Sequence, residues 1–599
     1  MNKPKYYNKK NFQYFSYFYS HLKHRVIISL FLSLAVGVLD GLGLAMFLPL
    51  LQMVEGSNSS VDADQLGNLS FIVDGLEAMG VKLNLTSVLV VMLVFFSLKG
   101  IMKFAELYLK VVYQQFFMRN IRVTNIDLLS SFSYNNFVSA DSGKIQNTFS
   151  GEVGRVNQAY RSYFTAIQYG VLVMVYISLA FLANPRFAIL VAIGGFLTNI
   201  VFKKLYKTTK KLSKRLTSES HEFQGLLIQK VTFFKYLKAS GLIYSYAGKL
   251  KKNINQIESS QRKIGTLNAT LQAIREPLVI FVVVVVILIQ VKVFSEGLGL
   301  IILSLLFFYR SLTFVMAMQN YWNDFLSMSG SLDNMTDFTN ELIAGKEVTG
   351  EVNFESFKNR IDVNSLSFSY PDATILNDLN FSIYKNETIA IVGESGSGKT
   401  TLINILSGLL KSSSGTIAID GRDINDLKIS TFQKRIGYIT QEPVIFNDTI
   451  FNNVTFWADK TAENLRKFEE ALKKAAIYSF VMEQPKQEDA LLGNSGVNIS
   501  GGQKQRLSIA RELYKEVDFL FMDEATSALD SETERAIQEN IDKLKGEFTI
   551  IIIAHRLSTI RNANRILYLN KGSVEYIGDF DSLKSNSTNF RRMVEFQKF

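Results

Sequence analysis

Long apolar segments alternate with polar ones over the first half of the chain. A helix needs about 20 apolar residues to cross the hydrocarbon layer of roughly 30 Å. The β-branched run at 282–286 would suggest a strand in a soluble protein, but the length and neighbours of its segment favour a membrane helix. The candidate spans, which together predict a helical domain with six spans, are residues 26–51, 86–113, 163–182, 187–202, 277–294 and 298–321.

The polar segments between the spans differ in charge. Residues 52–85 carry five acidic side chains against Lys82, whereas residues 203–215 carry seven lysine and arginine side chains. Because basic loops stay on the cytosolic side of a membrane, we expect the first segment to face outward and the second to be cytosolic. Residues 114–160 and 203–276 keep a helical pattern while becoming polar, so spans two to five should extend into the cytosol.

Two short segments flank the first span. Residues 11–22 combine aromatic side chains with basic neighbours, which predicts a short helix at the membrane surface. In the outer loop, Phe71, Ile72, Leu76 and Met79 fall at helical spacing. This spacing predicts a small amphipathic helix that rests on the outer surface or, equally well, packs on the spans.

Charged side chains interrupt the second span. Lys99, Lys103, Glu106 and Lys110 fall on one stripe at about 100° per residue, so they can avoid lipid together. Internal pairing, for instance of Lys103 with Glu106, would hide their charges from the membrane. The alternative is a cationic cavity for an anionic head group whose apolar tail stays in the membrane.

Lys99, Arg275 and Arg310 are the predicted substrate residues. At 1.5 Å per residue, Lys99 and Arg310 lie roughly 18 to 20 Å below the outer surface, and Arg275 just precedes the fifth span. An unpaired charge at such a depth costs at least ~2.5 kcal/mol, so these groups should face water rather than lipid. Pairing of Arg275 with Glu276 would again be the alternative.

The pattern changes in the second half of the chain. Polarity rises over residues 327–360, with glycines at 330, 345 and 350. From residue 361 onward short strands and helices alternate, as in a soluble α/β domain with a central parallel sheet. We therefore predict a transmembrane domain at 1–329, a linker at 330–360 and a second domain at 361–599.

A glycine-rich loop carries the clearest chemistry of the second domain. It lies between an apolar strand pattern at 388–392 and a helical pattern at 402–410. Such a loop turns backbone N–H groups around a polyphosphate, and the helix that follows presents its positive end. Lys399 would reach the β- and γ-phosphates, and the Thr400 hydroxyl would bind Mg²⁺. The residues that this G-x-x-x-x-G-K-[ST] pattern predicts to bind ATP are Gly393, Glu394, Ser395, Gly396, Ser397, Gly398, Lys399, Thr400 and Thr401.

Two further segments suit the chemistry of a triphosphate. Residues 518–522 form a buried-strand pattern that ends in the carboxylates Asp523 and Glu524. Asp523 would hold Mg²⁺ through water, and Glu524 would orient or deprotonate the attacking water. A second anion-binding site, suited to a γ-phosphate, is predicted where a helical pattern opens at Ser500, Gly501, Gly502 and Gln503.

Composition narrows the class of protein. A chain of 599 residues is too long for one core, and 47% apolar residues favour partial embedding in a membrane. A net charge of +11 would suit a nucleic-acid binder, but the basic residues follow the positive-inside bias, so we expect no nucleic-acid partner. The absence of cysteine excludes disulfides, cysteine–zinc sites and thiol nucleophiles.

Residues 361–599 resemble the nucleotide-binding domain of the ATP-binding cassette (ABC) transporters, with the motifs in the family's order. The loop at 393–401 is similar to its Walker A motif, residues 499–503 to its signature and residues 519–523 to its Walker B motif. By this likeness Tyr370 stacks on the adenine ring.

The resemblance also implies roles for single residues. Gln441, as the Q-loop glutamine, would bind Mg²⁺ together with Thr400 and Asp523. Glu524 would be the catalytic carboxylate and His555 the switch histidine. A D-loop residue, Asp530, is assigned to the nucleotide site in the same way.

Two positions depart from the family's pattern. The signature begins with Ile499 where the family usually has leucine, a conservative change that we expect to be neutral. Asn494 stands in a segment, 492–496, where many exporters have a glutamate that contacts the membrane domain.

The membrane half resembles the six-helix exporter type, so the resemblance implies a half-size exporter with a cytosolic ATPase domain. Its partner would be a second half-transporter, and the complete motif set predicts a homodimer with two competent ATP sites. Residues 39–50, the Lys99 region and residues 308–310 look most like bacterial flippases of lipid-linked oligosaccharides. This likeness implies a protein of the bacterial inner membrane that moves an amphipathic, anionic, lipid-linked substrate outward; the alternative is a peptide or multidrug exporter.

Three other classes share parts of this pattern. A soluble DNA-maintenance ATPase has the same cassette, but the six predicted spans argue against it. An importer subunit usually has its cassette on a separate chain. A nucleotide-gated channel or regulator with the same architecture remains open.

Overall fold

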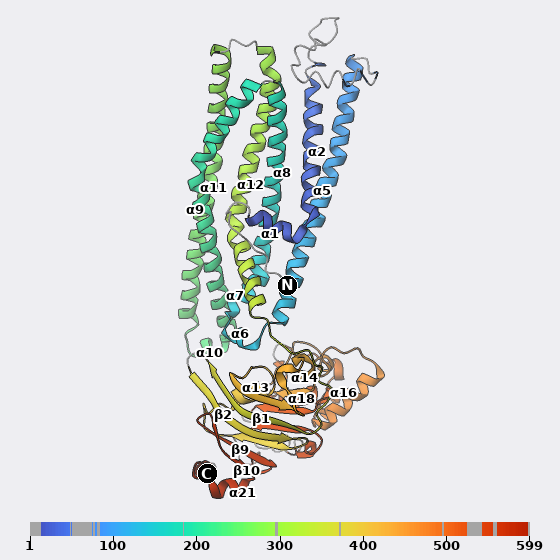
Figure 1. Ribbon diagram of the computed structural model, residues 1–599, viewed down its shortest axis with the longest axis vertical. Coiled ribbons are helices and arrows are strands. Elements are labelled where there is room, and N and C mark those ends of the chain that lie inside the picture. The colour runs from blue at the N-terminus through green and yellow to red at the C-terminus, as the bar shows by residue number, and fades with distance from the viewer. Residues whose placement is uncertain are drawn as a thin grey trace. The chain divides into compact units, whose positions relative to one another are not determined.

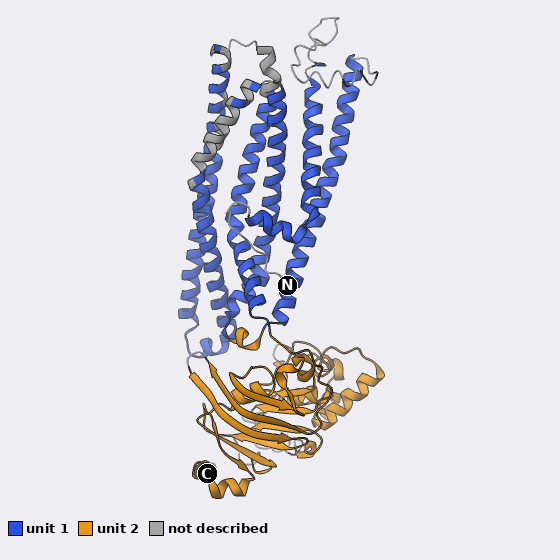
Figure 2. Cartoon of the chain, viewed as in Figure 1, with its two compact units in different colours: residues 1–132, 139–346 blue, residues 133–138, 347–599 orange. Residues whose placement is uncertain are grey.

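The computed structural model describes residues 13–47, 49–50, 84–183, 185–293, 298–370, 373–493, 496–523, 542–554 and 560–596, with single residues 75, 78, 80 and 539. Contacts group the chain into two compact units, which Figure 2 colours separately. Unit 1 comprises residues 1–132 and 139–346, and unit 2 comprises residues 133–138 and 347–599. Most of the short helix α6 (Tyr134–Ser139) therefore groups with the second unit, although it lies in the first half of the sequence.

Unit 1 is built from helices (Figure 1). Its short helices are α1 (Gln13–Leu22), α7 (Ser142–Asn147), the π-helical turn η2 (Thr148–Glu152) and α10 (Phe234–Ala239). Its long helices are α2 (His24–Ala45), α5 (Leu85–Ser130), α8 (Val153–Ala183), α9 (Pro185–Thr232), α11 (Ile243–Val293) and α12 (Leu298–Ala344). Each of the six predicted spans thus has a long helix. The predicted outer-loop helix at 71–79 lies almost wholly outside the described residues.

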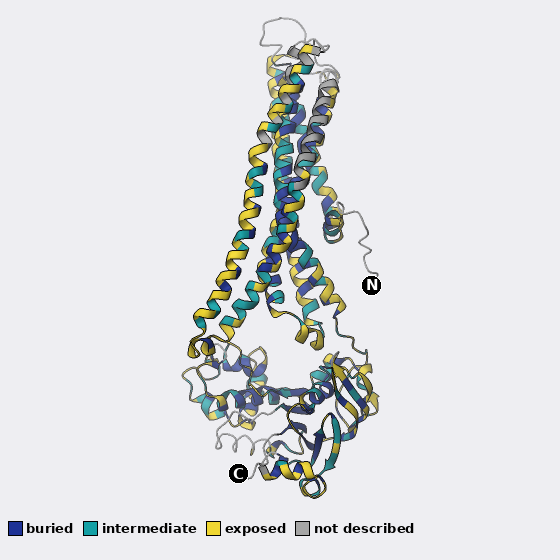
Figure 3. Cartoon of the chain, turned by 90° about the vertical axis from the view of Figure 1, so that its left-hand side faces the viewer, coloured by how far each residue is buried: buried dark blue, intermediate teal, exposed yellow. Residues whose placement is uncertain are grey.

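Length and composition make three of the described helical stretches apolar enough to cross a membrane: His24–Ala45, Leu85–Ser130 and Ser142–Leu182. Large apolar side chains remain exposed along α5, including Leu93 (68%) and Phe104 (71%). Figure 3 shows exposed residues along the long helices of unit 1. Lipid tails would cover such side chains in a bilayer.

Local sequence signals explain how α5 begins. The Asn84 side chain accepts a hydrogen bond from the Ser87 backbone N–H (2.8 Å), and the Ser87 hydroxyl accepts one from the Asn84 N–H (2.9 Å). This reciprocal capping box satisfies two of the donors that a helix start leaves unpaired. The helix then runs for 46 residues through the polar stripe without a break.

Glycines bring α2 close to both neighbouring helices. A Cβ atom at Gly41 would lie 2.1 Å from Leu179 of α8, and one at Gly37 would lie 2.9 Å from Leu172 of the same helix. A Cβ at Gly43 would lie 3.1 Å from the Phe96 ring of α5. Small residues at these positions therefore allow the close helix contacts that membrane proteins use for association.

Helix α1 packs on protein rather than lying free at a surface. Tyr14, Phe18 and Leu22, one helical turn apart, are buried. Phe18 contacts the rings of Phe117 on α5 and Tyr160 on α8, with centroids 5.4 and 5.7 Å apart. The predicted helix is present, but its aromatic side chains form part of a core.

Helix α12 continues to Ala344, so the first half of the predicted linker at 330–360 is helical. Gly330 lies within this helix and allows close packing: a Cβ there would lie 2.8 Å from the backbone of Ser213 on α9. The Gly330 N–H also donates to the Ser213 hydroxyl (3.0 Å). The domain bounds at 329 and 361 stay predictions.

Unit 2 has two sheets. One has the order β2-β1-β4-β5 and the other β10-β9-β3-β8-β7-β6, in which β9, β3, β8, β7 and β6 are parallel. The strands are β1 (Arg360–Tyr370), β2 (Ala373–Tyr384), β3 (Thr388–Val392), β4 (Ser414–Ile419), β5 (Arg422–Asp423), β6 (Ile436–Ile439), β7 (Phe519–Asp523), β8 (Thr549–Ile553), β9 (Arg565–Asn570) and β10 (Ser573–Gly578). The helices are α13 (Lys399–Leu406), η3 (Ile424–Asp426), α14 (Ile429–Gln433), α15 (Ile450–Thr455), α16 (Ala462–Lys474), α17 (Tyr478–Met482), η4 (Gln487–Asp489), α18 (Gly501–Tyr514), α21 (Phe580–Asn586) and α22 (Thr588–Phe596).

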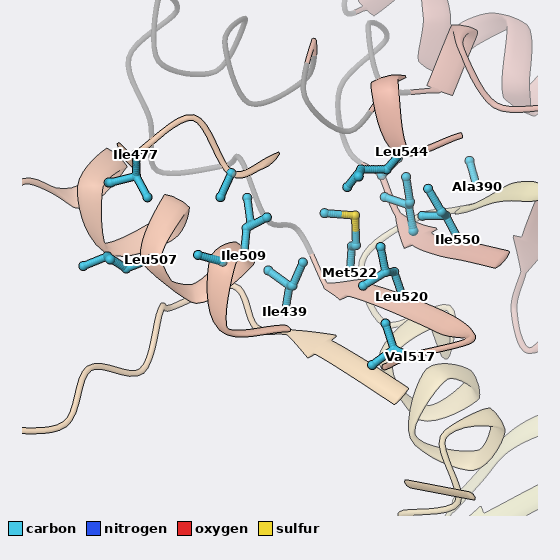
Figure 4. Packing of buried hydrophobic residues seen from close by; sticks show 14 of the residues in the cluster. Ala390, Ile439, Ile477, Leu507, Ile509, Val517, Leu520, Met522, Leu544 and Ile550 are labelled. Carbon is cyan, nitrogen blue, oxygen red and sulfur yellow. The ribbon is translucent and has the colours of Figure 1, made fainter. Parts of the chain in front are cut away.

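The central strands of the larger sheet are buried on both faces. All residues of β3 and β8 are buried, which explains their continuous runs of isoleucine, valine and alanine. One apolar cluster joins Leu520 and Met522 of β7 to Leu507 and Ile509 of α18 (Figure 4). This core fixes the strand ends that carry the candidate site.

Candidate functional site

The phosphate-binding loop at 393–398 joins β3 to α13, as the sequence predicts. Gly396 and Gly398 have φ angles of 81° and 101°, which side chains with a Cβ rarely adopt. The Lys399 side chain is buried, and its ammonium group donates to the carbonyl oxygens of Gly393 and Glu394, both at 2.9 Å. The backbone of the loop therefore holds the Lys399 ammonium group in place.

Three observations show that the loop fits a polyphosphate. The start of α13 has no side-chain cap. The Ser397 hydroxyl is buried and has no hydrogen-bond partner within the described residues. A Cβ at Gly396 would meet nothing within 4 Å, whereas one at Gly393 would lie 2.1 Å from the Leu569 carbonyl oxygen. One side of the loop is thus packed on β9 and the other is open, with donors available to a phosphate.

The other site residues gather at the carboxyl edge of the parallel strands. Asp523 at the end of β7 is in register with Ile553 of β8, which is in register with Ile391 of β3, two residues before the loop. Neighbouring strands lie about 4.8 Å apart, so the Asp523 and loop backbones are roughly 10 Å apart across β8. Open α/β sheets bind ligands at this edge.

Gln441 follows β6 at the same edge, and its side chain is exposed, as is that of Thr400. Tyr438 lies near the end of β6, where burial and then the charge of Asp523 raise the pKa of its phenol above the usual value. Thr400, Gln441 and Asp523 thus approach the loop from α13, β6 and β7. An oxygen set of this kind suits Mg²⁺, which prefers one or two protein oxygens together with phosphate oxygens.

Tyr370 ends β1, with 40% of its surface exposed. Its ring packs edge-on against Phe368, with centroids 4.9 Å apart. This partly exposed ring is the one that the sequence predicts to stack on the adenine.

The predicted signature, 499–503, opens α18. Ser500 caps the helix: its hydroxyl accepts from the Gln503 N–H (3.3 Å), and the Gln503 side chain accepts from the Ser500 N–H (2.8 Å). Ser500 and Gly501 are exposed, and a Cβ at Gly501 would meet nothing within 4 Å. Gly502 is buried. The signature therefore presents an open helix start on the surface of its own unit.

Several predicted site residues lie outside the described residues. Glu524 follows Asp523 directly, and His555 follows Ala554, whose N–H bonds the Ile391 carbonyl at the end of β3 (3.3 Å). Asp530 of the D-loop and Asn494 also lie outside.

The predicted substrate lysine of unit 1 is paired. Lys99 Nζ lies 2.6 Å from Asp40 Oδ1, and the Tyr176 hydroxyl donates to Asp40 Oδ2 at 2.6 Å. Asp40 is buried, and Arg310, half-buried on α12, interacts electrostatically with Tyr176. Side chains of α5 and α8 thus meet on one carboxylate of α2. The backbone of Arg275 lies in α11, and its side chain is outside the described atoms.

The rest of the polar stripe also bonds to protein. Lys103 Nζ lies 2.6 Å from Glu106 Oε2, the internal pair that the sequence left open. Glu106 Oε1 accepts from Ser33 (2.6 Å) and Gln168 (3.1 Å). Lys110 donates to Gln168 (2.8 Å) and to Thr165 (2.6 Å). The stripe therefore faces α2 and α8.

The sequence does not predict two residues whose side chains bond to several segments around these sites. Asp40 lies within the first predicted span, and a carboxylate inside a span is itself a signal of function. Arg511 of α18 is buried and donates to the carbonyls of Asn453 (2.6 Å) and Val444 (2.7 Å). It joins the signature helix to the segment that follows Gln441, a contact that no local sequence pattern reveals.

Comparison with known proteins shows which family model and which proteins the chain resembles. Residues 376–527 match the family model described as "ABC transporter". The "ATP-dependent lipid A-core flippase" of Syntrophus aciditrophicus is 38% identical over 238 residues, which are 40% of this chain and 39% of the relative. The protein of that name from Haemophilus influenzae is 28% identical over 73% of this chain and 75% of the relative. The "Heterocyst differentiation ATP-binding protein HepA" of Nostoc is 29% identical over 75% of this chain and 74% of the relative.

A solved structure has the same architecture over almost the whole chain. It is described as a bacterial Atm1-family ABC exporter with ATP bound; the TM-score is 0.77 at 22% identity, covering 97% of this chain and 99% of that one. The predicted fold class, a helical domain followed by an α/β ATPase domain, is confirmed. Residues 376–527 thus match the ABC transporter family model, and the chain as a whole has the fold of a bacterial Atm1-family ABC exporter.

Proposed function

We propose that this protein uses ATP to move an amphipathic, anionic, lipid-linked substrate from the cytosolic side of the bacterial inner membrane outward. The observation that carries the proposal is the excess of positive charge among the apolar helices of unit 1. There, Lys99 and Lys103 pair with Asp40 and Glu106, while Lys110, Arg161 and Arg310 add further positive charge. This excess of positive over negative charge suits an anionic head group such as a pyrophosphate.

Relatives support a lipid as the cargo. Two of those described above carry the name ATP-dependent lipid A-core flippase. A lipid-linked oligosaccharide would satisfy both the charge of the cluster and the exposed apolar surface of α5. Export of a peptide or drug is the alternative, and it predicts no dependence on the cargo's charge.

ATP bound at the nucleotide site would supply the free energy for transport. Backbone N–H groups of the loop, the start of α13 and Lys399 would hold the phosphates, while Thr400, Gln441 and Asp523 would hold Mg²⁺, which neutralises charge on the β- and γ-phosphates when bound. Glu524 would orient the attacking water, and His555 would contact the γ-phosphate. Tyr370 would stack on the adenine.

The partner would be a second copy of this chain. The open helix start at Ser500 and Gly501 has the geometry of an anion site that a neighbouring nucleotide can complete. Asp530 of the D-loop would lie at the same interface. Because one chain carries the complete motif set, a homodimer would have two competent sites. ATP turnover by the chain purified alone tests this, and inactivity until a different half-transporter is added would rule it out.

One experiment tests the choice of cargo. The full chain in phosphatidylcholine nanodiscs is titrated with a polyprenyl pyrophosphate, and ATPase stimulation is compared with that of a triple variant, Lys99→Gln, Arg275→Gln and Arg310→Gln. A matched control removes three exposed cytosolic charges instead, with Lys207→Gln, Lys211→Gln and Lys235→Gln. We expect stimulation of the wild type and the control but not of the triple variant. Equal stimulation of all three proteins would refute an anionic cargo.

A further inference from the structure

The Asp40 cluster has a feature that the proposed function does not explain. A site for an anion should leave its cations available, yet Lys99 is held by a buried carboxylate at 2.6 Å. Asp40 has only 6% of its side chain exposed, whereas Lys99 retains 28%. The lysine therefore reaches accessible space while its counter-ion stays behind it in the protein.

The protein fixes Asp40 in place from two sides. The Tyr176 hydroxyl on α8 occupies Oδ2 at 2.6 Å, and the contact of Gly41 with Leu179 holds α2 against the same helix. Gly43 lies against Phe96 of α5, and Lys99 lies 5.2 Å from the centre of that ring. Asp40 is thus anchored, and Lys99, on a flexible four-carbon chain, is the partner able to turn away.

The second pair in the membrane domain is built differently. Glu106 accepts from Ser33 and Gln168 as well as from Lys103, so both of its oxygens stay bonded within three helices. Asp40 instead has one donor on each oxygen, and one of these donors is Lys99. Without its lysine, Glu106 would keep the Ser33 and Gln168 donors, whereas Asp40 would keep only Tyr176. Asp40 therefore depends more on its lysine than Glu106 does.

We propose that Asp40 is the built-in counter-ion of the cargo site: it neutralises Lys99 when cargo is absent, and the anionic head group must take its place. This inference rests on the proposed function. A head group with a single negative charge only exchanges one anion for another beside Lys99, so it gains little binding free energy. A pyrophosphate also brings charge to Arg310, so Asp40 makes the site select polyanionic lipids over monoanionic ones.

The test compares three lipids of the same chain length: a polyprenyl pyrophosphate, a polyprenyl monophosphate and the neutral polyprenol. The full-length protein is placed in phosphatidylcholine nanodiscs, and the lipid concentration for half-maximal ATPase stimulation is measured. Removing the counter-ion with Asp40→Asn should lower this concentration for the monophosphate about tenfold and narrow the preference for the pyrophosphate. Asp333→Asn, which removes a carboxylate paired with Lys214 at 2.8 Å elsewhere in unit 1, is the matched control and should leave the preference between the two phosphates unchanged.

Two further variants keep the test decisive. Tyr176→Phe removes only the bond that anchors Asp40, and it should shift the monophosphate titration in the same direction by a smaller factor. The Asp40→Asn change made in a Lys99→Gln background should produce no shift, because the lysine that it would uncover is gone.

The outcomes separate the two proposals. If the pyrophosphate stimulates the wild type but Asp40→Asn and Tyr176→Phe leave the preference between phosphates unchanged, Asp40 is not the counter-ion and the proposed function stands. A shift of equal size in the Lys99→Gln background would also overturn the inference. If none of the three lipids stimulates the wild type, the proposed function and this inference fail together.

Discussion

The two candidate sites of this protein are assembled in opposite ways. At the nucleotide site, Lys399 bonds to carbonyls five and six residues away, and the backbone of one continuous loop makes the cradle. In the membrane helices, Lys99 bonds to a carboxylate 59 residues away, and that carboxylate bonds to a tyrosine a further 136 residues along. The first site is a local motif, whereas the second exists only after the helices have packed. A site built from one continuous loop can therefore be recognised in the sequence, whereas a site that exists only after helices have packed cannot.

The largest expected effect comes from removing the cation of the loop. Lys399→Ala should abolish ATP turnover, with a loss of at least about 10²-fold, because no other described side chain places a positive charge within the loop. A direct binding assay should show weakened ATP affinity as well. Lys411→Ala, which removes an exposed lysine after the same helix, is the control. Unchanged ATP affinity in the Lys399 variant would remove the loop from the nucleotide site.

The glycines of the loop separate backbone strain from packing. Gly396→Ala should cost about 1–2 kcal/mol, because alanine disfavours a φ of 81°. Gly398→Ala should cost more, since its Cβ would also lie 2.6 Å from Leu376 and 3.2 Å from the Ile375 carbonyl oxygen. Thermal unfolding of the full chain should rank the two variants in this order. An equal Tm would show that the contact with β2 relaxes freely.

This difference explains which parts of the structure the sequence predicts. The phosphate loop, the strand that ends at Asp523 and the six long helices follow from local periodicity and contiguous motifs. The pairing of Asp40 does not, because nothing near it in sequence indicates that Lys99 and Tyr176 will meet there. The packing role of Gly330 is hidden for the same reason, because its neighbour, Ser213, is 117 residues away.

The hydrogen bonds of Glu106 in the membrane domain should contribute measurably to the free energy of unfolding. Glu106→Gln replaces a buried carboxylate that serves three donors, and we expect a loss of about 1–3 kcal/mol. Lys103→Gln should cost less, because the Lys103 side chain is 42% exposed and water can replace its partner. The two variants are compared by thermal unfolding in detergent. A larger loss for Lys103→Gln would contradict the assignment of Glu106 as the anchor of this cluster.

The smallest predicted effect is a pH dependence in the cytosolic part of unit 1. Burial lowers the pKa of His221 below its usual 6.5, although Glu152 opposes this shift. The unfolded chain therefore binds a proton at a higher pH than the folded protein does. The stability that neutral His221 contributes is present above the unfolded pKa of about 6.5 and is lost as the pH falls toward the lowered folded value.

His221→Asn should therefore flatten the fall in the free energy of unfolding between pH 7 and 5.5 by a few tenths of a kcal/mol to about 1 kcal/mol. His21 also has a pKa lowered by burial, so only the difference between the two proteins isolates His221. Parallel pH profiles for the variant and the wild type would show that His221 does not contribute.

The central claim is that ATP drives an anionic lipid across the membrane, and flipping in sealed proteoliposomes tests it most directly. A fluorescent polyprenyl-pyrophosphate sugar is added to the outer leaflet together with MgATP, and its protection from an external quencher is followed. The account predicts protection that requires ATP, is absent in Glu524→Gln, and is much faster than for the same lipid without the pyrophosphate. Protection at the same rate with ADP, in Glu524→Gln or for the uncharged lipid would contradict it.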